Sequence, residues 1–157
     1  MTFQERAIVL RPGEGETVSV LGDRYTYKAT GEQTGGAYGL VETAVPAGSA
    51  GPPPHVHAGE EEAFYVLDGE VTVLLGDREV TASAGSFALV PRGTVHTFAN
   101  RTNREARFLA IISPAGFERA FAEMAEVAPS SEEPPDMDRL MEIARRYNLE
   151  IAGPPPA

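Results

Sequence analysis

The sequence predicts an all-β domain, either a sandwich or a barrel, followed by a short helical segment. Short β-like runs separated by glycine and proline fill the chain from Ala7 to about Ala99. Gly-Asp or Asp-Gly pairs at 22–23, 68–69 and 76–77 are typical of tight hairpins between neighbouring strands. At 157 residues we expect one domain, and the chain is long enough to bury a core.

The β-like runs define the strands that we expect. They lie at 7–10, 17–21, 24–29, 38–45, 63–67, 71–75, 79–82, 87–90 and 95–99. A further run, 107–112, is apolar almost throughout, so we expect a strand that is buried on both faces. We therefore assign 1–112 to the β structure and 113–157 to a helical extension that packs on it within the same domain.

The spacing of apolar residues becomes helical after Ser113 and Pro114. Ser113 can cap a helix, and Pro114 suits its first position. Two stripes at helical spacing follow, Phe117, Phe121, Met124 and Ala125, and then Met137, Leu140, Met141, Ala144 and Tyr147. We expect Asn148 to end the second helix, and the tail 153–157 is too rich in proline to be regular.

Two interpretations of these stripes remain open. Both helices can simply pack on the outside of the β structure, which is the ordinary role of an amphipathic helix. Alternatively, the first helix shields one mouth of a barrel, and Phe117 and Phe121 touch a ligand there.

The composition excludes several classes of partner. A net charge of −10 argues against nucleic acid and against anionic membrane surfaces, because both are polyanions. The chain has no cysteine, so any metal must be held by nitrogen and oxygen atoms. Residues 1–10 contain no apolar stretch of signal-peptide length, and no segment is long and apolar enough to span a membrane, so we expect a cytoplasmic protein.

All three histidines lie in two short patterns that have the spacing of metal ligands. His55 and His57 are followed by Glu62, and His96 lies 34 residues beyond Glu62. On a strand, His55 and His57 point to the same side, about 6–7 Å apart. Three imidazoles and one carboxylate suit one divalent transition metal per chain. The alternative is that His55 and His57 are exposed edge residues and that His96 is a core histidine.

A run of three prolines, 52–54, directly precedes His55. Three fixed φ angles make a stiff extended segment, which lowers the entropy cost of presenting His55 and His57. The run could also be a ligand for an SH3-type domain, but its position against the histidine pattern favours the first role.

The segments around these residues resemble the two signature motifs of the cupin superfamily. The second motif, GSFALVPRGTVHTFAN, matches at every fixed position, namely Gly85, Pro91, Gly93, His96 and Asn100. The first motif, GPPPHVHAGEEEAFYVLDGE (51–70), matches at His55, His57, Glu62 and Gly69. It departs from the family pattern only at its leading glycine, where this chain has Ser49. The two motifs together, 51–70 and 85–100, include all the candidate ligands.

The resemblance implies a double-stranded β-helix, or jelly-roll, barrel with the C-terminal helices outside it. The segments at 34–42 and in the helical tail also resemble small bacterial cupins of the quercetin 2,3-dioxygenase-like group. Relatives with this fold often pair as homodimers through an N-terminal strand, so the resemblance implies a homodimer as well.

Three consecutive acids compete for one ligand position. Adjacent strand residues face opposite sides, so Glu61 and Glu62 cannot both point inward. The six-residue step to Gly69 in the family motif selects Glu62. We expect Glu60 and Glu61 to be solvated.

Strand parity also indicates residues that line a substrate pocket. Phe64 and Val66 share the face of Glu62, and Phe98 shares the face of His96. Further candidates for the apolar wall are Tyr38, Phe87 and Leu89, joined by Phe117 and Phe121 if the first helix covers a mouth.

The resemblance implies a metal-dependent dioxygenase that acts on an aromatic or enolic hydroxyl compound. The metal would be iron, nickel, manganese, cobalt, copper or zinc, and Glu62 would be a fourth ligand or the base that accepts the substrate proton. Two alternatives stay open. One is a redox-neutral isomerase or polyketide cyclase, and the other is a non-catalytic module that binds small molecules. The expected partners are a small-molecule substrate, dioxygen and a second copy of the chain.

Overall fold

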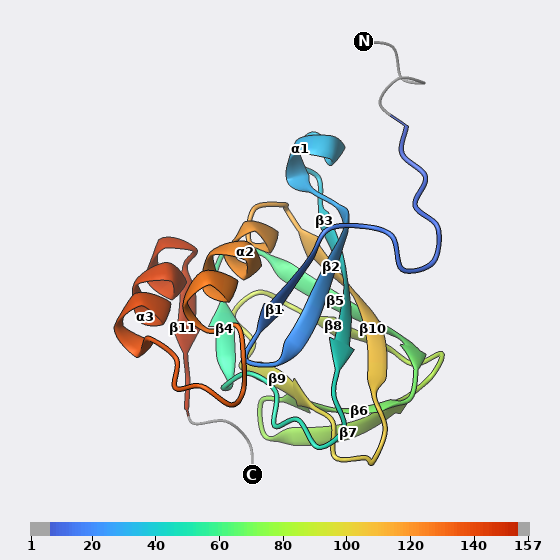
Figure 1. Ribbon diagram of the computed structural model, residues 1–157, viewed down its shortest axis with the longest axis vertical. Helices are drawn as coiled ribbons and strands as arrows, with labels where there is room; N and C mark the ends of the chain where they lie inside the picture. The colour runs from blue at the N-terminus through green and yellow to red at the C-terminus, as the bar shows by residue number, and fades with distance from the viewer. Residues whose placement is uncertain (1–6, 154–157) are drawn as a thin grey trace.

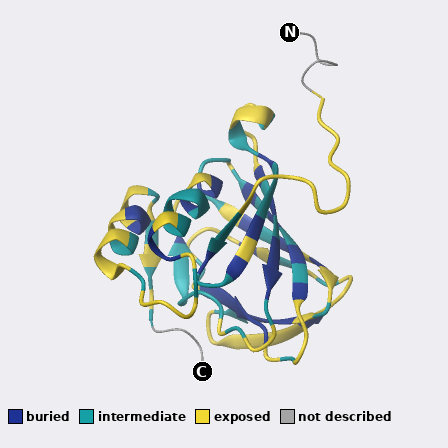
Figure 2. Ribbon diagram, viewed as in Figure 1, coloured by how far each residue is buried: buried dark blue, intermediate teal, exposed yellow. Residues whose placement is uncertain are grey.

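Two antiparallel sheets face each other in the computed structural model, which describes residues 7–153 (Figure 1). The larger sheet has the strand order β1 (Thr17–Val20), β2 (Asp23–Ala29), β3 (Gly39–Val45), β10 (Ala106–Ser113), β5 (Glu61–Asp68) and β8 (Phe87–Val90). The smaller sheet has the order β11 (Leu149–Ile151), β4 (His55–His57), β9 (His96–Ala99), β6 (Glu70–Leu75) and β7 (Arg78–Ser83). This is the mostly-β jelly-roll fold that the sequence predicts. Buried residues lie along the facing sides of the sheets (Figure 2).

The expectation of a strand at 7–10 is wrong. These residues form no regular structure, and Val9 is 89% exposed. An extended segment needs a neighbouring strand to satisfy its backbone N–H and C=O groups. Within residues 7–153 no strand pairs with this segment, although its apolar pattern resembles that of the true strands.

Strand β10 runs through the middle of the larger sheet, between β3 and β5. The expectation that it is buried on both faces is wrong. Phe108, Ala110 and Ile112 are buried on the inner face. Leu109 and Ile111 are half-buried, because nothing in the described part of the chain fully covers the outer face of the sheet.

The cross-strand register aligns the inward side chains in rows. Tyr25 of β2 lies opposite Thr43 of β3, which in turn lies opposite Phe108 of β10. Ile112 of β10 lies opposite Glu62 of β5. Phe108 and Ile112 are four residues apart, so the two rows are about 13 Å apart along the strands. The interior therefore has one end at Glu62 and another at Thr43.

Helices α2 (Glu118–Val127) and α3 (Met137–Arg146) lie beside β1, β4 and β11 (Figure 1). Helix α2 begins later than expected, because Ser113 still belongs to β10. Ser113 lies opposite Glu61 of β5, and its hydroxyl donates to the carbonyl oxygen of Ala37. The proposed cap at Ser113 is therefore wrong.

The structure of helix α3 matches what its sequence predicts. The side chain of Asp136 accepts a hydrogen bond from the backbone N–H of Arg139, which caps the first turn. The helix ends before Asn148, which has a φ of 55°. Strand β11, which the sequence does not predict, follows at once and pairs with β4 so that Leu149 lies opposite His57. The single-turn helix α1 (Gly31–Thr34) is also not predicted from the sequence.

The expected irregular tail continues into 154–157, which lie outside the described residues. None of the helices in residues 7–153 is both long enough and apolar enough to cross a membrane.

Candidate metal centre

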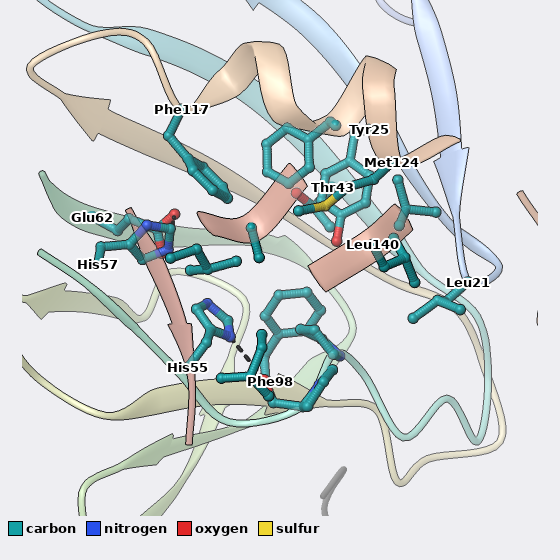
Figure 3. A pocket seen from close by; sticks show the side chains of 18 of the residues that line it. Leu21, Tyr25, Thr43, His55, His57, Glu62, Phe98, Phe117, Met124 and Leu140 are labelled. Carbon is teal, nitrogen blue, oxygen red and sulfur yellow. Dashed lines mark hydrogen bonds and ion pairs between the residues drawn. The ribbon is translucent and has the colours of Figure 1, made fainter. Parts of the chain in front are cut away.

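Strands from both sheets bring the four candidate ligands together. His55 and His57 lie on β4, His96 lies opposite His55 on β9, and Glu62 enters from β5 of the facing sheet. One ligand atom from each residue lies within 4.8 Å of every other. His57, Glu62 and His96 are buried, and His55 is half-buried against the cavity that the site adjoins (Figure 3).

Each imidazole is held from behind through its Nδ1 atom. Nδ1 of His55 lies 2.8 Å from the carbonyl oxygen of Pro53, and Nδ1 of His96 lies 2.9 Å from that of Thr94. Nδ1 of His57 lies 2.7 Å from Oε1 of Glu60. All three partners are acceptors, so Nδ1 carries the hydrogen and donates it. The lone pair of each neutral imidazole is then on Nε2.

The Nε2 atoms and the Glu62 carboxylate form a site that fits a cation. Nε2 of His96 lies 2.9 Å from Oε2 of Glu62. Nε2 of His57 lies 3.4 Å from Oε1 of Glu62 and makes no hydrogen bond within the described residues. Lone pairs facing carboxylate oxygens are stable only when a proton or a metal ion lies between them. The four residues can therefore hold one divalent metal.

Burial and charge set the protonation of the site. Burial, and next to it the charge of His96, lower the pKa of His55 to about 4. Burial alone would raise the pKa of Glu62, but the charge of protonated His57 and the hydrogen bond and charge of protonated His96 lower this pKa to about 2. At neutral pH the Glu62 carboxylate is therefore ionised and His55 is neutral, which is the state that metal ligands need.

His57 behaves differently. Burial would lower the pKa of His57, but the charge of Glu62 and the hydrogen bond to Glu60 outweigh burial and raise it. A proton on His57 therefore competes with a metal ion more strongly than a proton on His55 does.

The expectation that Glu60 is solvated is wrong. Its side chain is only 11% exposed and accepts the hydrogen bond from His57. Glu61 does point outward, with its side chain 47% exposed and 3.9 Å from Arg92. Glu60 precedes β5, so strand parity does not apply to it, and the three-residue step from His57 is the sequence signal that could have identified it.

A cavity of about 390 Å³ opens from the ligand cluster into the interior. Four of the expected wall residues line it: Phe64, Phe98, Phe117 and Phe121. The ring of Phe117 stands edge-on to that of His57, with 4.3 Å between the ring centres. Both interpretations of the first helical stripe are thus partly correct, because α2 packs on the sheet and also carries part of the cavity wall.

The other expected wall residues lie elsewhere. Phe87 and Leu89 are 62% and 54% exposed, because β8 pairs with β5 so that they share the outward face of Tyr65. Tyr38 is 42% exposed and precedes β3. Val66 is buried in the core but does not reach the cavity. The expectation for these four residues is therefore wrong.

The sequence does not predict the rest of the cavity wall. It includes Leu21, Tyr25, Thr43, Met124 and Leu140 (Figure 3), together with Met141, Ala144 and Ile151. The inward parity of β2 and β3 could have indicated Tyr25 and Thr43.

The proline run before β4 forms part of this site. Pro52 and Pro53 line the cavity, and the Pro52 carbonyl oxygen accepts a hydrogen bond from the hydroxyl of Thr97. Gly51 before them has a φ of 71°, and a Cβ atom there would clash with the carbonyl oxygen of Phe98. Ser49, which replaces the family glycine, donates its hydroxyl hydrogen to Asp23. The turn that leads into β4 is therefore stabilised by these contacts of Ser49 and Gly51, although the family glycine is absent.

Comparisons with known proteins agree with this fold. A family model described as a cupin domain matches residues 41–112. The chain is 24% identical over 151 residues to quercetin 2,3-dioxygenase of Bacillus subtilis, which covers 93% of this chain and 44% of that protein. It is 28% identical over 120 residues to quercetin 2,3-dioxygenase of Aspergillus japonicus, which covers 73% of this chain and 34% of that protein. The chain thus spans less than half the length of these two relatives.

Among solved structures, a predicted oxalate decarboxylase from Thermotoga maritima has the same fold. It superposes with a TM-score of 0.61 at 26% identity, over 68% of this chain and 99% of that one.

Proposed function

Because the chain belongs to the cupin superfamily, we propose that it is a metal-dependent dioxygenase that acts on an aromatic or enolic hydroxyl compound. The observation that carries this proposal is the placement of three histidines and one glutamate at one end of an apolar cavity. The similarity to two quercetin 2,3-dioxygenases supports oxygen chemistry on a ring that bears hydroxyl groups.

His55, His57 and His96 would hold the metal through Nε2. A bound iron, nickel, manganese, cobalt, copper or zinc ion would supply a Lewis acid that lowers the pKa of a substrate hydroxyl. Glu62 is ionised at neutral pH, so its carboxylate can either stay as a fourth ligand or accept that hydroxyl proton. Either role keeps the substrate oxygen beside Glu62.

The cavity wall fits an aromatic substrate better than a small acid. Phe64, Phe98 and Phe117 supply ring faces and edges, and they keep water away from the reacting end. Among the described residues that line the cavity there is no arginine or lysine. A dicarboxylate such as oxalate would therefore find no cationic partner there except the metal.

Oxygen uptake tests the proposal. The protein is loaded with each metal in turn and mixed with a flavonol, and dioxygen and flavonol are followed together. With a redox-active metal we expect dioxygen and flavonol to disappear in equal amounts. Glu62→Gln should lower kcat by about 10²–10⁴-fold if Glu62 is the base, whereas Glu61→Gln should leave it unchanged. No uptake with any redox-active metal would contradict the proposal.

The same experiment separates the alternatives. Conversion without oxygen uptake would support a redox-neutral isomerase or polyketide cyclase. Binding without conversion would support a non-catalytic module. We also propose that the protein acts in the cytoplasm, which its lack of cysteine suits and cell fractionation tests.

A further inference from the structure

The hydroxyl of Thr43 lies in the cavity wall without a partner. Thr43 is 1% exposed, and its Oγ1 atom makes no hydrogen bond to any of the described residues. Buried hydroxyl groups are nearly always hydrogen-bonded, so an exception in a cavity wall indicates a partner that comes from outside the chain. A bound ligand can supply that partner.

A second residue with a hydroxyl group, Tyr25, lies beside Thr43 in the sheet. Tyr25 is the cross-strand neighbour of Thr43, it is 6% exposed, and it lines the same cavity. Its ring is stacked on Phe121 with 4.1 Å between ring centres, which fixes the direction of the phenol. Burial, together with the charges of Asp23 and Glu62, raises the pKa of Tyr25 well above its usual value. The phenol therefore keeps its proton and can donate it.

Thr43 and Tyr25 occupy strand positions at the opposite end of the interior from Glu62. The row that contains Thr43 is about 13 Å along the strands from the row that contains Glu62. Figure 3 shows Thr43 and Tyr25 under α2, with His57 and Glu62 at the other side of the view. Apolar side chains, including Phe98 and Phe117, form the wall between the two ends.

We propose that Tyr25 and Thr43 form a second polar subsite that selects ligands with an oxygen function at each end. The ligand is a flat, mostly apolar ring compound. One hydroxyl lies at the histidine cluster, and a distal hydroxyl or carbonyl oxygen accepts a hydrogen bond from the Tyr25 phenol. Thr43 Oγ1 donates to the same oxygen or accepts from a distal hydroxyl. This inference rests on the proposed function, because it needs an aromatic ligand whose other end is at the metal site.

Matched ligands test the subsite by binding alone. The zinc-loaded protein is titrated without oxygen with 3-hydroxyflavone, which has no distal hydroxyl, and with 3,4′-dihydroxyflavone and 3,7-dihydroxyflavone. We expect at least one dihydroxy compound to bind about fivefold more tightly than 3-hydroxyflavone, as one net hydrogen bond predicts. Thr43→Val or Tyr25→Phe should abolish that preference and leave the affinity for 3-hydroxyflavone within about twofold.

Thermal unfolding of the ligand-free protein gives a readout that does not depend on flavones. Thr43→Val keeps the side-chain shape and removes a hydroxyl without a protein partner, so we expect Tm to stay the same or rise. Thr97→Val is the matched control, because the Thr97 hydroxyl is buried but donates to Pro52 over 2.7 Å. This control should lower Tm. An equal fall in Thr43→Val would show a structural partner for Thr43 and overturn the subsite.

The outcomes separate the subsite from the proposed reaction. One outcome is that Thr43→Val loses the preference for a dihydroxyflavone over 3-hydroxyflavone, while the assay above shows no oxygen uptake. That outcome would support the subsite and reject the dioxygenase. Oxygen uptake with equal affinities for all three flavones would support the dioxygenase and overturn the subsite. If none of the flavones binds, both proposals fall.

Discussion

The contact between Glu60 and His57 gives the sharpest prediction about the metal site. Glu60→Ala removes a carboxylate that accepts the Nδ1–H of His57 over 2.7 Å and is 11% exposed. A hydrogen bond to a charged group contributes about 1.5–3 kcal/mol, and each 1.4 kcal/mol is a factor of ten in Kd. The Kd for the metal should therefore rise about 10- to 100-fold, as is typical for outer partners of ligand histidines.

The assay is competition with a chromophoric chelator for zinc or cobalt at neutral pH. Glu60→Gln keeps an acceptor for His57 but loses the charge, so a smaller rise in Kd is expected. Glu61→Ala is the matched control, because Glu61 is the next residue, points outward and is 47% exposed. A Kd for Glu60→Ala within about twofold of that for Glu61→Ala would refute the assigned role of Glu60.

Three further predictions concern the pH dependence, the glycine turn and the oligomeric state. Glu62 and Glu60 raise the pKa of His57 above 6.5. As the pH is lowered, the protein should therefore start to lose metal before pH 6.5 is reached. A metal content that stays constant in dialysis from about pH 8 to 5 would exclude the imidazoles as the main ligands. Gly51→Ala should lower the free energy of unfolding in urea by more than about 4 kcal/mol. Gly76→Ala, also at positive φ but in open space, should lower it by only about 1–2 kcal/mol. Equal losses in the two variants would contradict the close approach of Gly51 to Phe98. The exposed Tyr65, Phe87 and Leu89 share the outward face of the larger sheet, so we propose that two chains form a homodimer through this face. Sedimentation should show a dimer that Phe87→Ser weakens. A wild-type protein that stays monomeric at high concentration would reject the dimer.

The ligand histidines could be predicted from the sequence because their geometry is mostly local. The two-residue period of a strand puts His55 and His57 on one side, whatever the rest of the fold does. The motif spacing then adds Glu62 and His96, and the structure brings these four residues together. The sequence also predicts β5, β6 and β7 closely, because apolar runs and the turns at 68–69 and 76–77 mark their ends.

The cavity wall could not be predicted in the same way, because it depends on which strands are neighbours. In the sequence, parity with Glu62 places Phe64 inward, whereas no ligand on the strand of Phe87 fixes the face of that residue. The pairing of β8 with β5 turns Phe87 outward, and the local pattern does not encode that register. Thr43 and Tyr25 look like ordinary strand residues until the register places them side by side at the far end of the interior.

Metal content per chain in the wild type and in His96→Ala tests the account most directly. Both proteins are incubated with a divalent transition metal, dialysed at neutral pH and assayed by elemental analysis, with circular dichroism as the check on folding. We predict about one ion per chain in the wild type and almost none in His96→Ala, with the β-sheet signal retained in both. Full occupancy in a folded His96→Ala protein, or an empty wild type, would contradict convergence of the four side chains on one ion.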